Sequence, residues 1–208
     1  FLQQYPNSVV KQQMLEVLMD AYTQTGNTQK ALDTARKVLQ VDPNDMRALA
    51  LSAYVLRTEA GQKTNPADAL PLLDEAAADA QKGLNAPAPT GADAANYEKM
   101  KTAVTPLFDG AIAADDLEKK DYAGAIKYFE AELGAMPEQQ TTAGPGIEDT
   151  YLLGTAYVQQ KPQDLVKAVW YLSRAAAYAP EPFKDQIQKA AQYWYKKYQG
   201  GMDGFDQV

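Results

Sequence analysis

The sequence of 208 residues contains neither cysteine nor histidine. Their absence excludes thiolate nucleophiles, disulfides, imidazole bases and most zinc or copper sites, so the side chains that enzymes use most often are missing. We therefore expect a protein that is not an enzyme and that uses no cofactor and no metal ion.

Positive charge is also scarce, because 20 lysines and arginines face 27 aspartates and glutamates, for a formal net charge of −7. Nucleic acids and anionic membranes are bound through clustered cations, and the pair Lys196 and Lys197 is not such a cluster. No apolar run reaches the roughly 18 residues of a membrane-spanning helix. We expect neither a nucleic acid partner nor a membrane span in this chain, whose 46% hydrophobic content is sufficient for a sizeable core.

A fixed spacing between alanine and proline recurs along the chain, and each such stretch is an amphipathic run that ends at the proline. The small alanine lets two antiparallel helices approach closely, whereas the proline cannot continue a helix and forces a turn. Apolar residues between them recur at intervals of three and four, as on one face of a helix. The three pairs, each twelve residues apart, are Ala31 and Pro43, Ala125 and Pro137, and Ala168 and Pro180.

Each amphipathic run follows an earlier helix of similar character, so the sequence predicts helical hairpins. The first of these helices spans residues 12–25, and Gly26 and Asn27 then supply a helix stop and a new cap. The last spans residues 148–159, with Pro162 in an enlarged connecting turn.

A degenerate hairpin is predicted between the first and later copies. Its first helix covers residues 46–58, and its second begins at Asn65 and Pro66 and runs to about Leu84. The stretch 85–92, rich in proline, alanine and glycine, is interpreted as a connection inside one domain.

These positions resemble the tetratricopeptide repeat family, whose pattern combines a large residue, Leu-Gly, Tyr, Ala, a bulky residue, Ala and Pro. The copy ending at Pro137 departs from the pattern at Asp116, where tyrosine is expected. The first copy carries the pattern as Leu15, Leu18, Met19, Tyr22, Ala31, Ala35, Val38 and Pro43. The last copy carries it as Leu153, Gly154, Tyr157, Ala168, Leu172, Ala175 and Pro180.

The resemblance implies an all-α fold, a right-handed α-α superhelix of about four helical hairpins plus a C-terminal capping helix. One domain would then cover residues 1–208. Its parts would be a repeat at 12–45, a degenerate repeat at 46–87, repeats at about 104–137 and about 147–180, and the capping helix at 183–198.

In the family, the outward positions of the first helix in each hairpin line a concave groove that binds partners. The acidic segment beside two arginines favours a mixed-charge peptide or helix as the partner. The alternative, that these are ordinary solvated residues, stays open. By spacing, the implied groove residues are Gln13, Glu16, Asp20 and Thr23, then Arg47, Tyr54 and Arg57, and finally Tyr151, Thr155 and Val158.

Aromatic residues gather on the capping helix. Trp194 and Tyr198 fall on the stripe predicted to face inward, with Phe183 and Ile187, whereas Tyr193 and Tyr195 point elsewhere. Tyr193 and Tyr195 are therefore a candidate outer patch for a protein or a sugar, and core packing of the whole group is the alternative.

Two functions follow as expectations. The first is a non-enzymatic protein–protein interaction scaffold that holds a peptide or partner protein in the groove. The alternative is an accessory or glycan-binding and substrate-binding module of a cell-envelope enzyme system, with Tyr195 touching glycan. The Tyr5-Pro6-Asn7-Ser8 entry resembles repeat proteins of the bacterial cell envelope. We therefore expect the periplasm or cell envelope, with an export signal or membrane anchor upstream of Phe1, and keep the cytoplasm as the alternative location.

Overall fold

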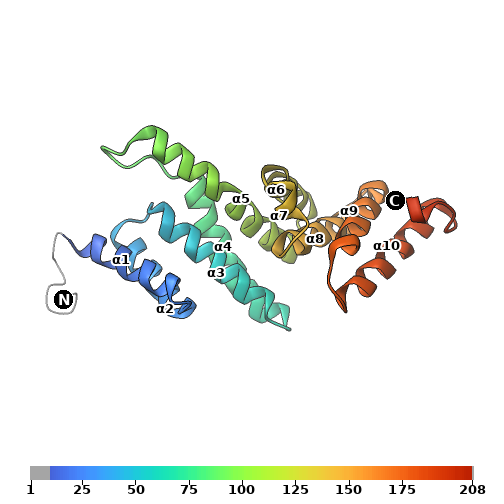
Figure 1. Ribbon diagram of the computed structural model, residues 1–208, viewed down its shortest axis with the longest axis horizontal. Coiled ribbons are helices and arrows are strands. Elements are labelled where there is room, and N and C mark those ends of the chain that lie inside the picture. The colour runs from blue at the N-terminus through green and yellow to red at the C-terminus, as the bar shows by residue number, and fades with distance from the viewer. Residues whose placement is uncertain (1–9, 208) are drawn as a thin grey trace. The chain divides into compact units, whose positions relative to one another are not determined.

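The computed structural model describes residues 10–207, and in this range the chain forms ten α-helices, one short 3₁₀ helix and no strand (Figure 1). Helices that follow one another along the chain pack as adjacent pairs. The predicted all-α class is confirmed. The chain divides into two compact units, with Asp115 as the last residue of the first and Asp116 as the first residue of the second. The predicted entry segment at residues 5–8 lies outside the described residues.

The first unit contains the two predicted N-terminal hairpins. Both hairpins agree closely with the expected bounds, but the next helix begins well before residue 104, where the third repeat was predicted to start. The helices are α1 (Lys11–Gln24), α2 (Thr28–Val41), α3 (Met46–Gly61), α4 (Pro66–Asn85) and α5 (Ala94–Glu118), whose last residues belong to the second unit.

Side-chain caps explain where three of these helices begin. The Asn27 side chain accepts a hydrogen bond from the Lys30 amide before α2, and Asp45 accepts one from the Ala48 amide, 2.8 Å away, before α3. Asn65 does the same for α4 at 3.1 Å from the amide of the residue after Pro66. Such caps satisfy amides that have no partner inside the helix, so the sequence marks each start locally.

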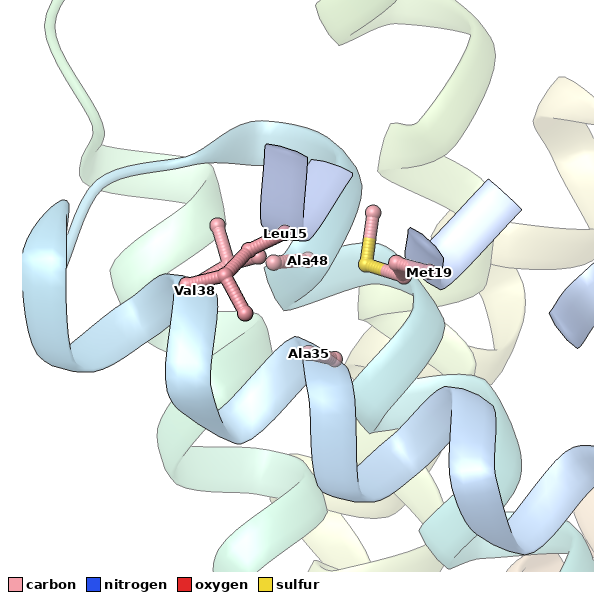
Figure 2. Close-up of a cluster of buried hydrophobic side chains, with 5 residues drawn as sticks. All are labelled: Leu15, Met19, Ala35, Val38 and Ala48. Atoms are coloured by element: carbon pink, nitrogen blue, oxygen red, sulfur yellow. The ribbon is translucent and has the colours of Figure 1, made fainter. Parts of the chain in front are cut away.

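The inner faces of the first three helices meet in one apolar cluster (Figure 2). Leu15 and Met19 come from α1, Ala35 and Val38 from α2, and Ala48 from α3, and all five side chains are buried. The alanines add little volume, which lets the helices approach closely. The predicted stripe of α1 therefore does face the second helix of its own hairpin.

Helix α4 packs against α2, α3 and α5 within the first unit. Arg36 on α2 holds Glu75 through two hydrogen bonds of 2.8 Å, and Ser52 on α3 donates a buried hydrogen bond of 2.7 Å to Asp79. Where α4 meets α5, the ring of Phe108 is fully buried against Gly83. A Cβ atom at Gly83 would lie 2.3 Å from the ring, so a larger residue there would force the ring to shift.

The second unit contains the predicted last hairpin and the capping helix, which spans Phe183–Gln199 instead of 183–198. A short helix before the hairpin was not predicted. The elements are α6 (Tyr122–Ala135), α7 (Glu138–Thr141), α8 (Pro145–Gln159), α9 (Leu165–Tyr178), α10 (Phe183–Gln199) and the 3₁₀ helix η1 (Phe205–Gln207).

Close contact through a glycine also joins the helices of the last hairpin. A Cβ atom at Gly154 of α8 would lie 2.9 Å from Leu172 Cγ on α9. Helix α9 also buries Ala175 and Ala176 against Ile187 of α10. No helix among residues 10–207 combines the length and apolar character that a bilayer crossing requires.

Replacing Gly83 by alanine tests the contact between α4 and α5. We expect Gly83→Ala to lower the free energy of unfolding by about 1–3 kcal/mol, because the new methyl group overpacks the Phe108 ring. Urea unfolding followed by circular dichroism measures the effect. Gly61→Ala is the matched control, since nothing lies within 4 Å of a Cβ atom there. Equal stability of the two variants would contradict the packing of Phe108 on Gly83.

Candidate functional site

Two predicted groove residues meet on the surface of the first unit. The guanidinium of Arg47 on α3 donates a hydrogen bond to the carboxylate of Asp20 on α1. This hydrogen bond, supported by the nearby carboxylates of Asp20, Asp45 and Glu16, raises the pKa of Arg47. The outward faces of α1 and α3, the first helices of two successive hairpins, are therefore side by side.

The Asp20–Arg47 pair remains open to solvent, because the two side chains are 41% and 47% exposed. Exposed ion pairs contribute about 1 kcal/mol or less to stability, since water solvates both charges well in the absence of the contact. Such a pair can therefore exchange its partners for the charges of a ligand at little cost to the fold.

The other predicted residues of α1 and α3 differ in their exposure. Gln13 and Thr23 are exposed, Glu16 is half-buried, and the ring of Tyr54 is 52% exposed. Arg57 is half-buried and already interacts with other parts of the chain. We call the exposed and half-buried set Gln13, Glu16, Asp20, Thr23, Arg47 and Tyr54 the α1–α3 face.

The predicted groove residues of α8 are less accessible. Tyr151 is half-buried and packs against the α9–α10 core, while the Thr155 hydroxyl donates to the Tyr151 carbonyl at 3.1 Å. Val158 is only 4% exposed, so its placement in an open groove was wrong. The enlarged turn after α8 folds back there, and Gln163 Nε2 donates to the Val158 carbonyl at 2.6 Å.

The outer aromatic patch on α10 also needs correction. Tyr193 is exposed as expected, but Tyr195 is only 6% exposed. The chain after α10 folds back over Tyr195, whose hydroxyl donates to the Asp203 carbonyl at 2.6 Å and whose ring contacts Phe205. Tyr195 lies four residues after the buried Ala191, and the residues that follow the helix complete its cover.

The inward stripe of α10 is rotated from the predicted one. Ile187, Ala191 and Tyr195 are buried at intervals of four residues, whereas Phe183 and Tyr198 are exposed. Four residues turn a helix by slightly more than one revolution, so a small error in phase exchanges one edge of the stripe for the other.

A polar cluster that sequence reasoning missed joins three helices of the second unit. Lys167 Nζ on α9 lies 3.0 Å from Glu130 Oε1 on α6 and 2.8 Å from Tyr157 Oη on α8. The Tyr157 hydroxyl donates to the same carboxylate, and its ring stacks on Tyr171. Tyr157 was recognised only as the repeat's tyrosine, and the spacing gave no sign of its partners on other helices.

The ionisation of this cluster follows from its contacts. Burial and the hydrogen bond to Glu130 raise the pKa of Tyr157 to about 12. Burial alone would raise the pKa of Glu130, but hydrogen bonds from Tyr157 and Lys167 outweigh it and hold that pKa below its usual value. Hydrogen bonds to Tyr157 and Glu130 raise the pKa of Lys167. At neutral pH, Tyr157 therefore stays neutral between the charged side chains of Glu130 and Lys167. We interpret the cluster as a structural link between the three helices.

Nothing in the described range gathers three or more side chains that could hold a metal ion. Comparisons of the chain with known protein families, with curated proteins and with solved structures found no significant match.

The raised pKa of Tyr157 predicts a pH-dependent loss of stability. Its folded pKa of about 12 exceeds the usual value near 10, so the folded chain holds this proton more tightly than the unfolded chain. We expect the free energy of unfolding to fall between about pH 10 and pH 12 more steeply than in Tyr157→Phe, which cannot titrate. Urea unfolding at several pH values measures both slopes, and identical slopes would contradict the assignment.

Proposed function

We propose that the chain is a helical-repeat protein of the tetratricopeptide type and acts as a non-enzymatic scaffold that binds a peptide or partner protein on the α1–α3 face. The observation that carries the proposal is the exposed contact between Asp20 and Arg47, which brings the outward residues of two successive hairpins together. A ligand lying across both helices would meet them at once.

On α1 and α3, the residues that fill the core are different from the outward charged residues, and this supports a binding role. Leu15 and Met19 of α1 and Ala48 of α3 fill the core, so Asp20 and Arg47 are not needed there. Their mixed charges suit a partner segment that carries both signs. Binding would replace one weak exposed ion pair by two pairs across the interface, and charge complementarity of this kind gives specificity and orientation.

Tyr54 supplies the aromatic part of the proposed site. Arg47 and Tyr54 are two helical turns apart on α3 and therefore lie on one side of it. Tyrosine and arginine are the residue types that most often dominate binding energy at protein interfaces, because they bury a large area and keep polar groups to orient the partner. We expect Tyr54 and Arg47 to be the two strongest contributors.

Two further considerations favour the scaffold. The chain has neither histidine nor cysteine for catalysis. The glycan-binding alternative depended on Tyr193 and Tyr195 together, and the second of these is buried. Placement in the bacterial periplasm or cell envelope stays a prediction, which a cellular fractionation of the native host would test.

Selection of peptides from a random display library on the immobilised chain tests the proposed function. We expect selected peptides to bind with micromolar affinity and to lose at least about tenfold in affinity with Arg47→Ala or Tyr54→Ala, the loss typical of an interface hot spot. Fluorescence anisotropy with synthetic copies of the selected peptides gives the dissociation constants.

Matched controls remove similar groups elsewhere. Lys37→Ala removes an exposed cation from α2, and Tyr198→Ala removes an equally exposed tyrosine from α10. Peptides that bind all four variants equally, or a selection that yields no binder, would refute the α1–α3 face as the binding site.

A further inference from the structure

A small pocket opens between α9 and α10 in the second unit. Its volume is about 160 Å³, comparable to the roughly 150 Å³ of a protein cavity that holds a benzene ring. It can therefore accept one aliphatic side chain. The apolar wall is formed by Ala176, Ala177, Ala191 and Phe205, and the polar groups are those of Ser173, Lys184 and Gln188.

The C-terminal segment forms one wall of this pocket. Phe205 of η1 packs edge-on against Tyr195, with ring centres 5.3 Å apart. The Tyr195 hydroxyl holds the preceding turn through the Asp203 carbonyl. The wall is therefore anchored to α10 before any ligand arrives, and such preorganisation lowers the entropic cost of binding.

The polar groups of the pocket are available to a ligand. Ser173 Oγ is buried and has no hydrogen-bond partner in the structure. Buried hydroxyls are nearly always satisfied, because leaving one without a partner is unfavourable. Lys184 makes no ion pair with any residue in the described range. A hydroxyl and an ammonium group beside an apolar wall would suit a ligand with an aliphatic group next to oxygen acceptors.

The two helices that form the pocket are basic, although the whole chain is acidic. They carry six cations and one acid, Asp185. Lys167 and Arg174 are paired with Glu130 and Glu138 of neighbouring elements, while the cations of α10 make no ion pair within the described residues. The six are Lys167, Arg174, Lys184, Lys189, Lys196 and Lys197. Complementary charge therefore points to an acidic ligand.

Helix α9, which forms one side of the pocket, also carries an exposed aromatic stripe. Trp170, Arg174 and Tyr178 follow at intervals of one turn, and the guanidinium of Arg174 lies 5.6 Å from the Trp170 ring and 5.8 Å from the Tyr178 ring. Both rings are about half exposed. Consecutive residues of a helix are about 100° apart, so this stripe lies on the face of α9 next to the one that carries Ser173 and Ala177.

We propose that this pocket docks an acidic protein segment, which inserts one aliphatic side chain between α9 and α10. The segment's oxygen atoms accept hydrogen bonds from Ser173 and Lys184. None of these residues belongs to the α1–α3 face, so this surface is a second one and its test is independent of the first.

Fluorescence anisotropy at low salt with a labelled peptide, Gly-Asp-Asp-Leu-Asp-Asp-Gly, tests the proposal. Both ends of the peptide are blocked, so a terminal carboxylate plays no part. We expect it to bind at least about tenfold more tightly than the same peptide with alanine for leucine, because the leucine side chain fills the pocket. A peptide with asparagine at all four aspartates should also bind at least about tenfold more weakly.

Variants of the protein assign the binding to the pocket. Lys184→Ala removes the pocket's cation, and Ala177→Phe fills the pocket from its exposed rim. Each should weaken binding about tenfold, whereas Lys189→Ala removes one cation of α10 outside the pocket and should have less than a threefold effect. Thermal unfolding by circular dichroism confirms that each variant is folded. Tyr54→Ala, on the α1–α3 face, should leave this affinity unchanged.

Several outcomes would overturn the proposal. They are absence of peptide binding up to millimolar concentration, equal affinity for the leucine and alanine peptides, or unchanged binding by Lys184→Ala and Ala177→Phe. Binding of polygalacturonate that depends on Lys184, without binding of any peptide, would assign the pocket to an acidic glycan instead. Failure here would leave the α1–α3 face untouched, because its own variants report on it separately.

Discussion

Close approach of helices through alanine and glycine is the constraint on which the rest of this structure depends. Ala35 in the first unit and Ala168 in the second are fully buried, and Gly83 and Gly154 admit Phe108 and Leu172 at distances where a Cβ atom would force a shift. Each helix has a one-sided apolar stripe that it cannot bury alone, so the pairs form only where small residues allow the backbones to meet. Pairing then decides which residues remain outside.

This packing determines which outward residues lie close to one another. Because the core draws α1 and α3 together through Leu15, Met19 and Ala48, the carboxylate of Asp20 reaches Arg47 without contributing to the core itself. A rigid inner face with weak polar contacts on the outer face is a physical arrangement suited to binding, since the outer groups can change partners while the fold stays intact. Helix α9 is divided in the same way, because Leu172 and Ala176 on its inner face are buried while Trp170 and Tyr178 on its outer face are exposed.

The two units differ in how they use polar groups. In the second unit, Glu130, Tyr157 and Lys167 tie three helices together and hold a neutral tyrosine between opposite charges, which makes the cluster a fixed link. Helices α9 and α10 are basic, although the chain as a whole carries a net negative charge. Phe205 of the C-terminal turn forms one wall of the pocket between these two helices. The local charge of a surface therefore indicates the charge of its ligand better than the net charge of the chain does.

Local sequence signals determined the helices of the two N-terminal hairpins and of the last hairpin, because caps such as Asn27 and Asp45, and apolar residues at helical spacing, act within a few residues of the chain. They also predicted that Asp20, Arg47 and Tyr54 face outward. They did not predict α7 or the start of α5. Only the tertiary structure decided which phase of α8 and α10 faces inward, and it buries Val158 four residues after Gly154 and Tyr195 four residues after Ala191. The residues after α10 complete the cover of Tyr195. Contacts between residues distant in sequence leave no periodic trace, so the cluster around Tyr157 and the pocket beside Ser173 emerged from packing alone.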